Sequence, residues 1–350
     1  MGSNPADESS PEPQVSVIIV NHNRAELLLE CLQSVVAQTY RNLEILIVDN
    51  GSSDHSDQAA KSFADARIHW IPLEKNLGFA GGCNVGIRRA RGEFVALLNN
   101  DAVAGEDWIE QLMVPMLDDP DTGMCASKIL FHGEDVIDKV GHLIYLDGQN
   151  RGRGTGERDS GQYDRREETL FPDGCAALYR RELMEQVGGF DEEFFAYGDD
   201  ADLGIRIRLL GSICQYVPEA IVYHRHSSTL GSYSLQKIFW VERNRFWLAM
   251  KSFPFVLLVL NPFFTTARWA WNVAAFLAGA GPAGNYRRKA SSGGLVGAVF
   301  RAYLAGLAGA PRMLRKRSSV RSMRRLSDIE FIKLLWRFRI SAKRLAYRDR

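Results

Sequence analysis

The chain has 350 residues, of which 46% are hydrophobic and 24% charged, and this composition excludes a wholly disordered, collagen-like or coiled-coil protein. The net charge of +1 hides an asymmetry: residues 281–350 contain 18 Lys and Arg against 3 Asp and Glu, whereas the first 280 residues contain 25 against 39. A basic region of this size is typical of chains that meet a polyanionic partner, such as a membrane surface or nucleic acid. The five cysteines form no CxxC pair, which disfavours a zinc ribbon and a disulfide framework.

Residues 1–14 predict a disordered leader without the features of a signal peptide. Apolar runs then predict strands at 15–20, 43–48, 68–71 and 94–98. Helical patterns lie between them: one after Asn23, which is expected to cap it, a short one near 56–63, and one running from the Gly-rich stretch to about residue 91. This alternation predicts an α/β fold with a mainly parallel sheet and helices on both faces.

Polar residues gather where three of the predicted strands end, at 21–23, 49–50 and 99–101. In open α/β sheets ligands bind at the carboxyl ends of the strands. We therefore expect one cleft built from three separate segments.

Each motif in this cleft also has an ordinary structural explanation. The segment 49–54 (DNGSSD) suits a base or ribose, but also an Asx turn. Residues 78–86 match neither a Walker A loop nor GxGxxG, and their glycines favour either close approach to a ligand or tight helix–sheet packing. Asn99 and Asp101 have the spacing to face one hard cation, Mg²⁺ or Mn²⁺, or simply to form a turn.

An acidic cluster lies later in the chain, at Asp199, Asp200 and Asp202. Carboxylates this close raise one another's pKa, and such a group can serve as a general base. The alternative is a helix N-terminus, where the helix dipole favours acids. His224 ends another apolar run and becomes a candidate ligand if it lies near Asp101.

The composition changes after about residue 235. Well before that point, the stretch 147–169 is Gly-rich and charged, and this composition predicts a mobile loop. Two later apolar stretches, 253–280 and 294–310, are interrupted by Pro262, Arg268 and Arg301. They indicate either a transmembrane hairpin or helices lying in the membrane interface, and the cost of arginine in a bilayer favours the second. We expect a leader (1–14), a catalytic domain (15–235) and a basic, helical, membrane-associated region (236–350) facing anionic lipid headgroups.

Six segments, taken together and in order, resemble the family 2 glycosyltransferases with the GT-A fold. They are VSVIIVNHNR, EILIVDNGSSD, NLGFAGGCNVGI, FVALLNNDAV, GCAALYRRELMEQVGGFDEEFFAYGDDADLGIRIRLLG, and VYH at 222–224. The likeness covers about residues 15–230, and within the family the chain looks most like the rhamnosyltransferases of O-antigen, capsule and cell-wall synthesis. Two positions depart from the family pattern: Asn99 replaces the first carboxylate of the DxD motif, and Asp199 replaces the usual Glu.

The resemblance implies a role for each matching residue. Asp200 would be the general base, and Asp101 and His224 would bind the metal. The remaining residues would bind or support the donor and acceptor: Asn23, Asp49, Asp54, Asn76, Gly78, Asn84, Asn99, Asn100, Asp173, Gly174, Glu192, Asp199 and Asp202.

The implied activity is inverting transfer of a sugar from a nucleotide-diphosphate donor, with dTDP-L-rhamnose as the best candidate. The acceptor would be a glycan or a lipid-linked hydroxyl at the cytoplasmic face of the cell membrane, and the cofactor Mg²⁺ or Mn²⁺. The segment QKIFW at 236–240 lacks the Arg of a QxxRW motif, which disfavours a processive synthase. The alternative is a non-catalytic, membrane-associated protein that binds nucleotide or RNA. The sequence shows no RRM, KH or zinc-knuckle pattern, so nucleic acid is the less favoured partner.

Overall fold

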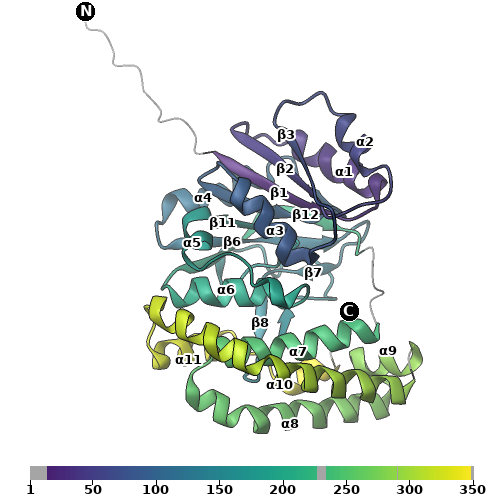
Figure 1. Ribbon diagram of the computed structural model, residues 1–350, viewed down its shortest axis with the longest axis vertical. Coiled ribbons are helices and arrows are strands. Elements are labelled where there is room, and N and C mark those ends of the chain that lie inside the picture. Colours follow the sequence, from purple (N-terminus) through teal and green to yellow (C-terminus); the bar gives the residue numbers. More distant parts are fainter. Residues whose placement is uncertain (1–13, 227–233, 290, 348–350) are drawn as a thin grey trace, which may run out of the picture.

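The computed structural model describes residues 14–226, 234–289 and 291–347, so nearly all of the expected leader lies outside the described residues. An α/β part, whose sheet begins near the N-terminus, lies above a layer of C-terminal helices (Figure 1). The α/β part positions the polar residues singled out in the sequence. The helices below it close one side of the same site.

The four predicted strands are all present and adjacent, in the order β3 (Ile68–Pro72), β2 (Leu43–Asp49), β1 (Val15–Asn21) and β4 (Phe94–Leu98). These four strands are mutually parallel. Nearly all residues of β1, β2 and β4 are buried. Burial on both faces explains their continuous apolar sequences. Because β1 has β2 on one side and β4 on the other, the connections diverge there and leave a crevice at the carboxyl ends.

The rest of the main sheet is mixed in direction. Strand β11 (Ala176–Arg180) is antiparallel to both β4 and β6 (Thr122–Phe131), and β12 (Ile213–His224) is parallel to β6. Three short strands complete this sheet: β5 (Ala102–Ala104), β7 (Ile137–Lys139) and β10 (Glu167–Thr169). Strands β8 (His142–Ile144) and β9 (Asn150–Gly152) form a separate pair. The return of β12 beside β5 brings His224 opposite Ala102, next to Asp101.

Helices cover both faces of the sheet, as the sequence predicts. Helices α1 (Ala25–Val36) and α4 (Trp108–Asp118) pack on one face, and α3 (Gly78–Arg89), α5 (Arg181–Gln186) and α6 (Asp199–Leu209) on the other. The short helix α2 (Ser56–Lys61) contacts α1. On α3, a Cβ at Gly82 would lie 2.6 Å from Val20 and one at Gly86 2.5 Å from Ile18. These two glycines therefore serve tight helix–sheet packing, one of the two alternatives left open by the sequence.

The prediction that Asn23 caps α1 is wrong. Asn23 and Arg24 both have positive φ, and the Asn23 side chain accepts a hydrogen bond from the Ser53 backbone N–H at 2.9 Å. The Ala25 N–H at the start of α1 instead donates to Asp54 at 3.1 Å. The cap comes from a segment about thirty residues away, which local sequence does not reveal.

The prediction of a mobile loop at 147–169 is also wrong, because this stretch contains β9 and β10 and is tied down by long-range contacts. The Lys128 ammonium, on β6, binds Asp159 at 2.6 Å and Asp164 at 2.7 Å. The Arg153 guanidinium lies over the rings of Tyr163 and Tyr216. Glycine and charge content predicted mobility, but Lys128 and Tyr216 come from other parts of the fold.

The C-terminal region is helical, as expected, and consists of α7 (Leu235–Ser252), α8 (Phe255–Ala278), α9 (Gly281–Lys289), α10 (Ser292–Met323), α11 (Asp328–Arg337) and α12 (Ala342–Tyr347). It shares a hydrophobic core with the α/β part, in which Phe171 and Ile205 cluster with Trp247, Met313 and Phe331. Arg268, which interrupts the apolar run of α8, is buried and paired with Asp147 and Glu242. That charge is therefore neutralised inside the protein.

Part of the basic region is neutralised by the acidic body. Arg312 binds Glu193 at 2.6 Å, Lys316 binds Asp191 and Glu193, and Arg337 binds Glu168. In the described part of the chain, one helical stretch, Gly293–Met323, is long and apolar enough to cross a membrane.

Candidate active site

A cavity of about 1750 Å³ opens at the carboxyl ends of β1, β2 and β4 and continues beneath α6 to the C-terminal helices. It brings together ten of the residues predicted from sequence: Asn76, Gly78, Asn99, Asn100, Asp101, Asp173, Gly174, Asp199, Asp200 and His224. The expected cleft therefore exists, and it draws on more segments than the three predicted.

Side-chain amides join the strand ends around the cavity. Asn100 donates to Asn21 at 2.8 Å, and Asn21 donates to Asp49 at 3.3 Å. Asn50 donates to Asn76 at 3.1 Å and accepts a hydrogen bond from the Leu77 backbone N–H at 2.8 Å. The sequence does not mark Asn21 and Asn50 as predicted site residues, although their positions directly at strand ends are a usable signal. Their network fixes the spacing of the loops that form the crevice.

The turn after β2 is held by its own carboxylates. Asp49 accepts a hydrogen bond from Ser52, and Asp54 accepts from Ser56 and from Ala25. Neither Asp49, Asp54 nor Asn23 lines the main cavity, whereas Arg24, set between the two loops, does. These hydrogen bonds fix the segments on either side of Arg24 at the edge of the cavity.

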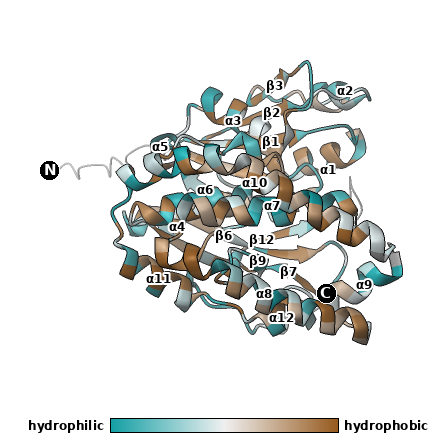
Figure 2. Ribbon diagram, turned by 60° about the horizontal axis from the view of Figure 1, so that its bottom comes forward, coloured by the Kyte–Doolittle hydropathy of each residue, from teal (hydrophilic) through white to brown (hydrophobic). Residues whose placement is uncertain are grey.

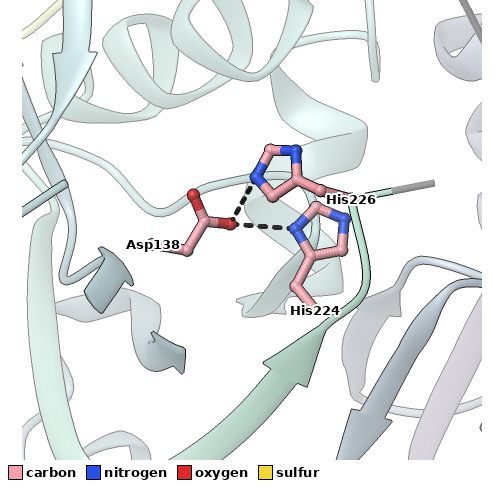
Figure 3. A group of neighbouring side chains, drawn as sticks. All are labelled: Asp138, His224 and His226. Atoms are coloured by element: carbon pink, nitrogen blue, oxygen red, sulfur yellow. Dashed lines mark hydrogen bonds and ion pairs between the residues drawn. The ribbon is translucent and has the colours of Figure 1, made fainter. Parts of the chain in front are cut away.

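The predicted metal ligands lie together, as the sequence argument required. His224 Nε2 is 3.2 Å from Asp101 Oδ1, and both side chains line the cavity. On its other side, His224 Nδ1 is 2.9 Å from Asp138 Oδ2, which also contacts His226 Nε2 at 3.0 Å (Figure 3). Asp138 lies on β7 in a stretch with no distinctive motif, so sequence reasoning missed it.

The charges around His224 perturb its titration and that of Asp138. Burial alone would raise the pKa of Asp138, but the Lys139 ammonium and hydrogen bonds from both histidines hold it well below its usual range. Burial alone would lower the pKa of His224, but interactions with Cys175, Asp101 and Asp138 raise it well above its usual value. Two carboxylates thus flank the imidazole and favour its protonated form.

These residues fit a divalent cation. A metal-bound histidine usually gives its second ring nitrogen to a carboxylate, and Asp138 occupies that position for His224. A carboxylate oxygen and an imidazole nitrogen suit Mn²⁺, and Mg²⁺ accepts the oxygen, with the remaining ligands supplied by substrate phosphates. Asp101 and His224 would hold the ion, and a bound cation would displace the imidazole proton.

The acidic cluster lies at the first turn of α6. Asp200 accepts hydrogen bonds from the N–H groups of Ala201 at 2.7 Å and Gly174 at 3.4 Å. Burial, and then the charge of Asp173, raises the pKa of the Asp200 carboxyl. Burial, and then the charge of Asp200, raises the pKa of Asp199 to about 8, and its Oδ2 has no hydrogen-bond partner among the described residues. Asp199 is therefore protonated at neutral pH and Asp200 is the carboxylate suited to accept a proton.

Asp173 stands between the metal and acid groups. Its carboxylate binds Lys139 at 2.8 Å and His142 at 2.9 Å. Burial alone would raise the pKa of Asp173, but these two neighbours lower it well below its usual value. Asp173 thus remains charged beside Asp200.

Besides Asn23, Asp49 and Asp54, three further predicted site residues do not line the cavity. Asn84 donates to the Phe190 carbonyl and to Glu192, both at 2.9 Å, and so anchors the loop before α6. Glu192 lies on that loop, outside the cavity. Asp202 is wholly buried and binds Arg206 and Lys251. All three connect the loop before α6 to its surroundings.

This loop is strained and is held by α7. Phe195 and Tyr197 both have positive φ, a costly conformation for residues with aromatic side chains. The buried Asn244 side chain donates to the carbonyls of Phe194, Ala196 and Tyr197 at 3.0, 2.9 and 2.7 Å. Asn244 lies in the C-terminal region and was not predicted, because nothing in its local sequence indicates these distant partners.

Comparison with known proteins identifies the α/β part. Residues 16–188 match the family model described as Glycosyl transferase family 2. This part of the chain is a family 2 glycosyltransferase domain. The finer assignment to rhamnosyltransferases stays a prediction.

Relatives of this glycosyltransferase domain occur in larger proteins. The chain is 26% identical to the O-antigen biosynthesis protein RfbC of Myxococcus xanthus, over 69% of this chain and 20% of that protein. It is 30% identical to an uncharacterized glycosyltransferase of Rickettsia prowazekii, over 57% of this chain and 60% of that one. The matched part of the chain thus spans about one fifth of the length of the M. xanthus protein and three fifths of the length of the R. prowazekii protein.

A solved structure shares the fold. A mannosyltransferase from Pyrobaculum calidifontis, solved in complex with GDP-Man and Mn²⁺, superposes with a TM-score of 0.52 at 20% identity. The superposition covers 93% of this chain and 88% of that one, so it includes most of the C-terminal helices. The fold is therefore of the GT-A type, as predicted, with a mixed sheet.

Proposed function

We propose that this chain is an inverting glycosyltransferase that moves a sugar from a nucleoside-diphosphate donor to a hydroxyl group of a glycan or lipid-linked acceptor. The observation that carries the proposal is the meeting of Asp101 and His224 with Asp200 in one cavity. The name of the M. xanthus relative and the GDP-Man in the P. calidifontis structure support nucleotide-sugar chemistry in cell-surface glycan synthesis. For the donor we propose dTDP-L-rhamnose, on the resemblance of the sequence alone.

In this mechanism Asp200 takes the proton of the acceptor hydroxyl while that oxygen attacks the anomeric carbon. The bond to the diphosphate breaks on the opposite side, which inverts the anomeric configuration. The raised pKa of Asp200 suits this carboxylate to the role of general base. General-base assistance is worth about 10²–10⁴-fold in rate. A Mn²⁺ or Mg²⁺ ion held by Asp101 and His224 would supply positive charge beside the departing diphosphate.

We also propose that the protein acts at the cytoplasmic face of the membrane. Large apolar side chains are exposed on α8, among them Phe255 (67%), Val259 (62%), Phe263 (69%) and Leu277 (70%). Hydrophobic residues recur along α8 and α11 in Figure 2. Together with the basic C-terminal residues they suit an anionic lipid surface. Release from membranes by carbonate or high salt is expected for interfacial helices, and a requirement for detergent would indicate a spanning one.

The function is tested with the purified chain, Mn²⁺ or Mg²⁺ and a panel of nucleotide sugars, by measuring released nucleoside diphosphate. Asp200→Asn is expected to lower transfer at least about 100-fold while the donor still binds. Asp118→Asn, an exposed carboxylate on α4, is the matched control and is expected to behave as wild type. Near-wild-type transfer by Asp200→Asn, or no turnover of any nucleotide sugar, would contradict the proposal.

A further inference from the structure

The cavity that contains the catalytic residues extends well beyond them. Its far part lies among α7, α8, α9 and α10, where the lining side chains are mostly apolar. We call this part the apolar arm and define it by Trp269, Val273, Phe276, Leu295, Val299 and Phe300. A nucleotide sugar carries a diphosphate and a hydroxylated sugar, and it has no hydrocarbon chain that could fill this lining. The apolar arm therefore suits a different part of the reaction's substrates.

The apolar arm opens to the surface beside exposed apolar residues. Val296 and Phe300 line the cavity and yet are 70% and 62% exposed, so the opening lies along α10. Leu304 and Leu307 continue this exposed row on the same helix, at 51% and 59%. A hydrocarbon chain leaving a lipid phase at this surface would stay in contact with apolar side chains until it enters the cavity. Burial of each methylene group adds a favourable contribution to the binding free energy, so a long hydrocarbon chain is favoured inside the apolar arm.

A lysine that forms no salt bridge with any described carboxylate lies in the same cavity as the apolar arm and the catalytic groups. Lys237, on the first turn of α7, lines the cavity, and its Nζ is 5.1 Å from the centre of the Tyr197 ring. No carboxylate of the described residues forms a salt bridge with it, whereas Lys139, in the same cavity, binds Asp173. Burial, and then the charge of Lys139, lowers the pKa of Lys237. An anionic group bound at this point would stabilise the charged ammonium.

We propose that the apolar arm binds the hydrocarbon chain of a phosphorylated lipid, with its phosphate at Lys237 and the accepting end directed toward Asp200. The inference rests on the proposed function and names the acceptor class of the same site. Val241, one turn along α7 from Lys237, also lines the cavity. Glu242 and Arg245, farther along the same helix, line it too, but they are paired with each other, and Glu242 is also paired with Arg268. An ammonium group that forms no salt bridge with a described carboxylate, beside an apolar lining, matches a molecule with a charged head and a long apolar tail.

The test measures binding of farnesyl phosphate to the purified full chain by titration calorimetry, with farnesol and inorganic phosphate as separate probes. Farnesyl phosphate is expected to bind at least tenfold more tightly than either probe. Val299→Trp, which fills the apolar arm, and Val273→Asp, which makes it polar at a half-exposed position, are each expected to weaken binding at least tenfold. Leu117→Trp, at an exposed leucine of α4 that does not line the cavity, is the matched control and is expected to bind as wild type does. Lys237→Met is expected to weaken the binding of farnesyl phosphate and to leave the binding of farnesol unchanged.

Donor hydrolysis in the presence of Mn²⁺ is measured on the same preparations and separates the two proposals. A wild-type chain that hydrolyses a nucleotide sugar but does not bind farnesyl phosphate overturns the lipid site and leaves the proposed function standing. Binding that depends on the apolar arm, in a chain without any turnover, overturns the function alone. Equal weakening of farnesyl phosphate binding by Val299→Trp and Leu117→Trp overturns the site. Val273→Asp, at a position open to solvent, keeps the test decisive if the tryptophan variant does not fold.

Discussion

Arg268 offers the sharpest test of how the C-terminal helices are held, because it sits in a buried cluster of four charges. Its guanidinium donates to Asp147 at 2.6 Å and to both oxygens of Glu242 at 2.8 Å. Arg245 completes the cluster, at 3.2 Å from Glu242 and 3.4 Å from Asp147. All four side chains are at least 94% buried. Two cations and two carboxylates make the cluster neutral, and the positive charges outweigh the effect of burial and lower the pKa of both acids.

Arg268→Met removes one cation and leaves two buried carboxylates to share Arg245. Breaking a buried pair in this way typically costs about 3–5 kcal/mol, because an uncompensated charge stays behind. The double variant Arg268→Met, Glu242→Met restores neutrality and keeps the pair of Asp147 with Arg245. We expect it to be more stable than the single variant, although it carries one more substitution.

The measurement is urea unfolding followed by tryptophan fluorescence and far-ultraviolet circular dichroism. Arg301→Met, which removes an exposed arginine of α10, is the matched control and is expected to change stability by less than about 0.5 kcal/mol. Destabilisation of the double variant equal to the sum of the two single variants would refute the reasoning, because independent residues add and coupled ones do not. A loss no larger than that of Arg301→Met would show that Arg268 carries no structural charge.

Three further predictions concern the catalytic part. Asp138→Asn should weaken Mn²⁺ binding about 10–100-fold, because the carboxylate no longer supports His224. Calorimetric titration checks this, with the exposed Asp135→Asn as control. An affinity for Mn²⁺ unchanged by Asp138→Asn would contradict the prediction. Asn244→Ala should lower kcat/KM by tenfold or more and cost roughly 1–3 kcal/mol, since three carbonyls of the strained loop lose their donor; wild-type kinetics would exclude a positioning role. The pKa of Asp199 is raised from 3.8 to about 8, so between these pH values the folded state holds a proton that the unfolded chain has released. The stability that this proton contributes is fully present below about pH 4 and is lost as the pH rises through 8. Asp199→Asn should therefore gain stability relative to wild type between pH 5 and pH 8, as measured by urea midpoints, and parallel pH curves would rule this out.

Local sequence determined the framework. The apolar runs of β1, β2, β3 and β4 predicted strands that the structure contains almost to the residue. In β1, β2 and β4 burial on both faces requires such runs. The polar residues at the strand ends predicted where the cleft would lie, since parallel strands present their carboxyl ends at one edge. The placement of Asp101 close to His224 followed from the family resemblance, and the pairing of β5 with β12 accounts for it.

Tertiary structure alone decided which charges are neutralised and which loops are fixed. Asp138 lies in an unremarkable stretch and becomes the partner of His224 only because β7 pairs with β6 beside β12. The stretch 147–169 looked mobile by composition and is ordered by distant partners such as Lys128. Arg268 looked like a charge that a membrane would have to tolerate, and it is instead paired inside the protein. Patterns of hydrophobicity report on one element at a time, whereas ion pairs and hydrogen bonds depend on which elements the fold brings together, and that information is absent from any single stretch of sequence.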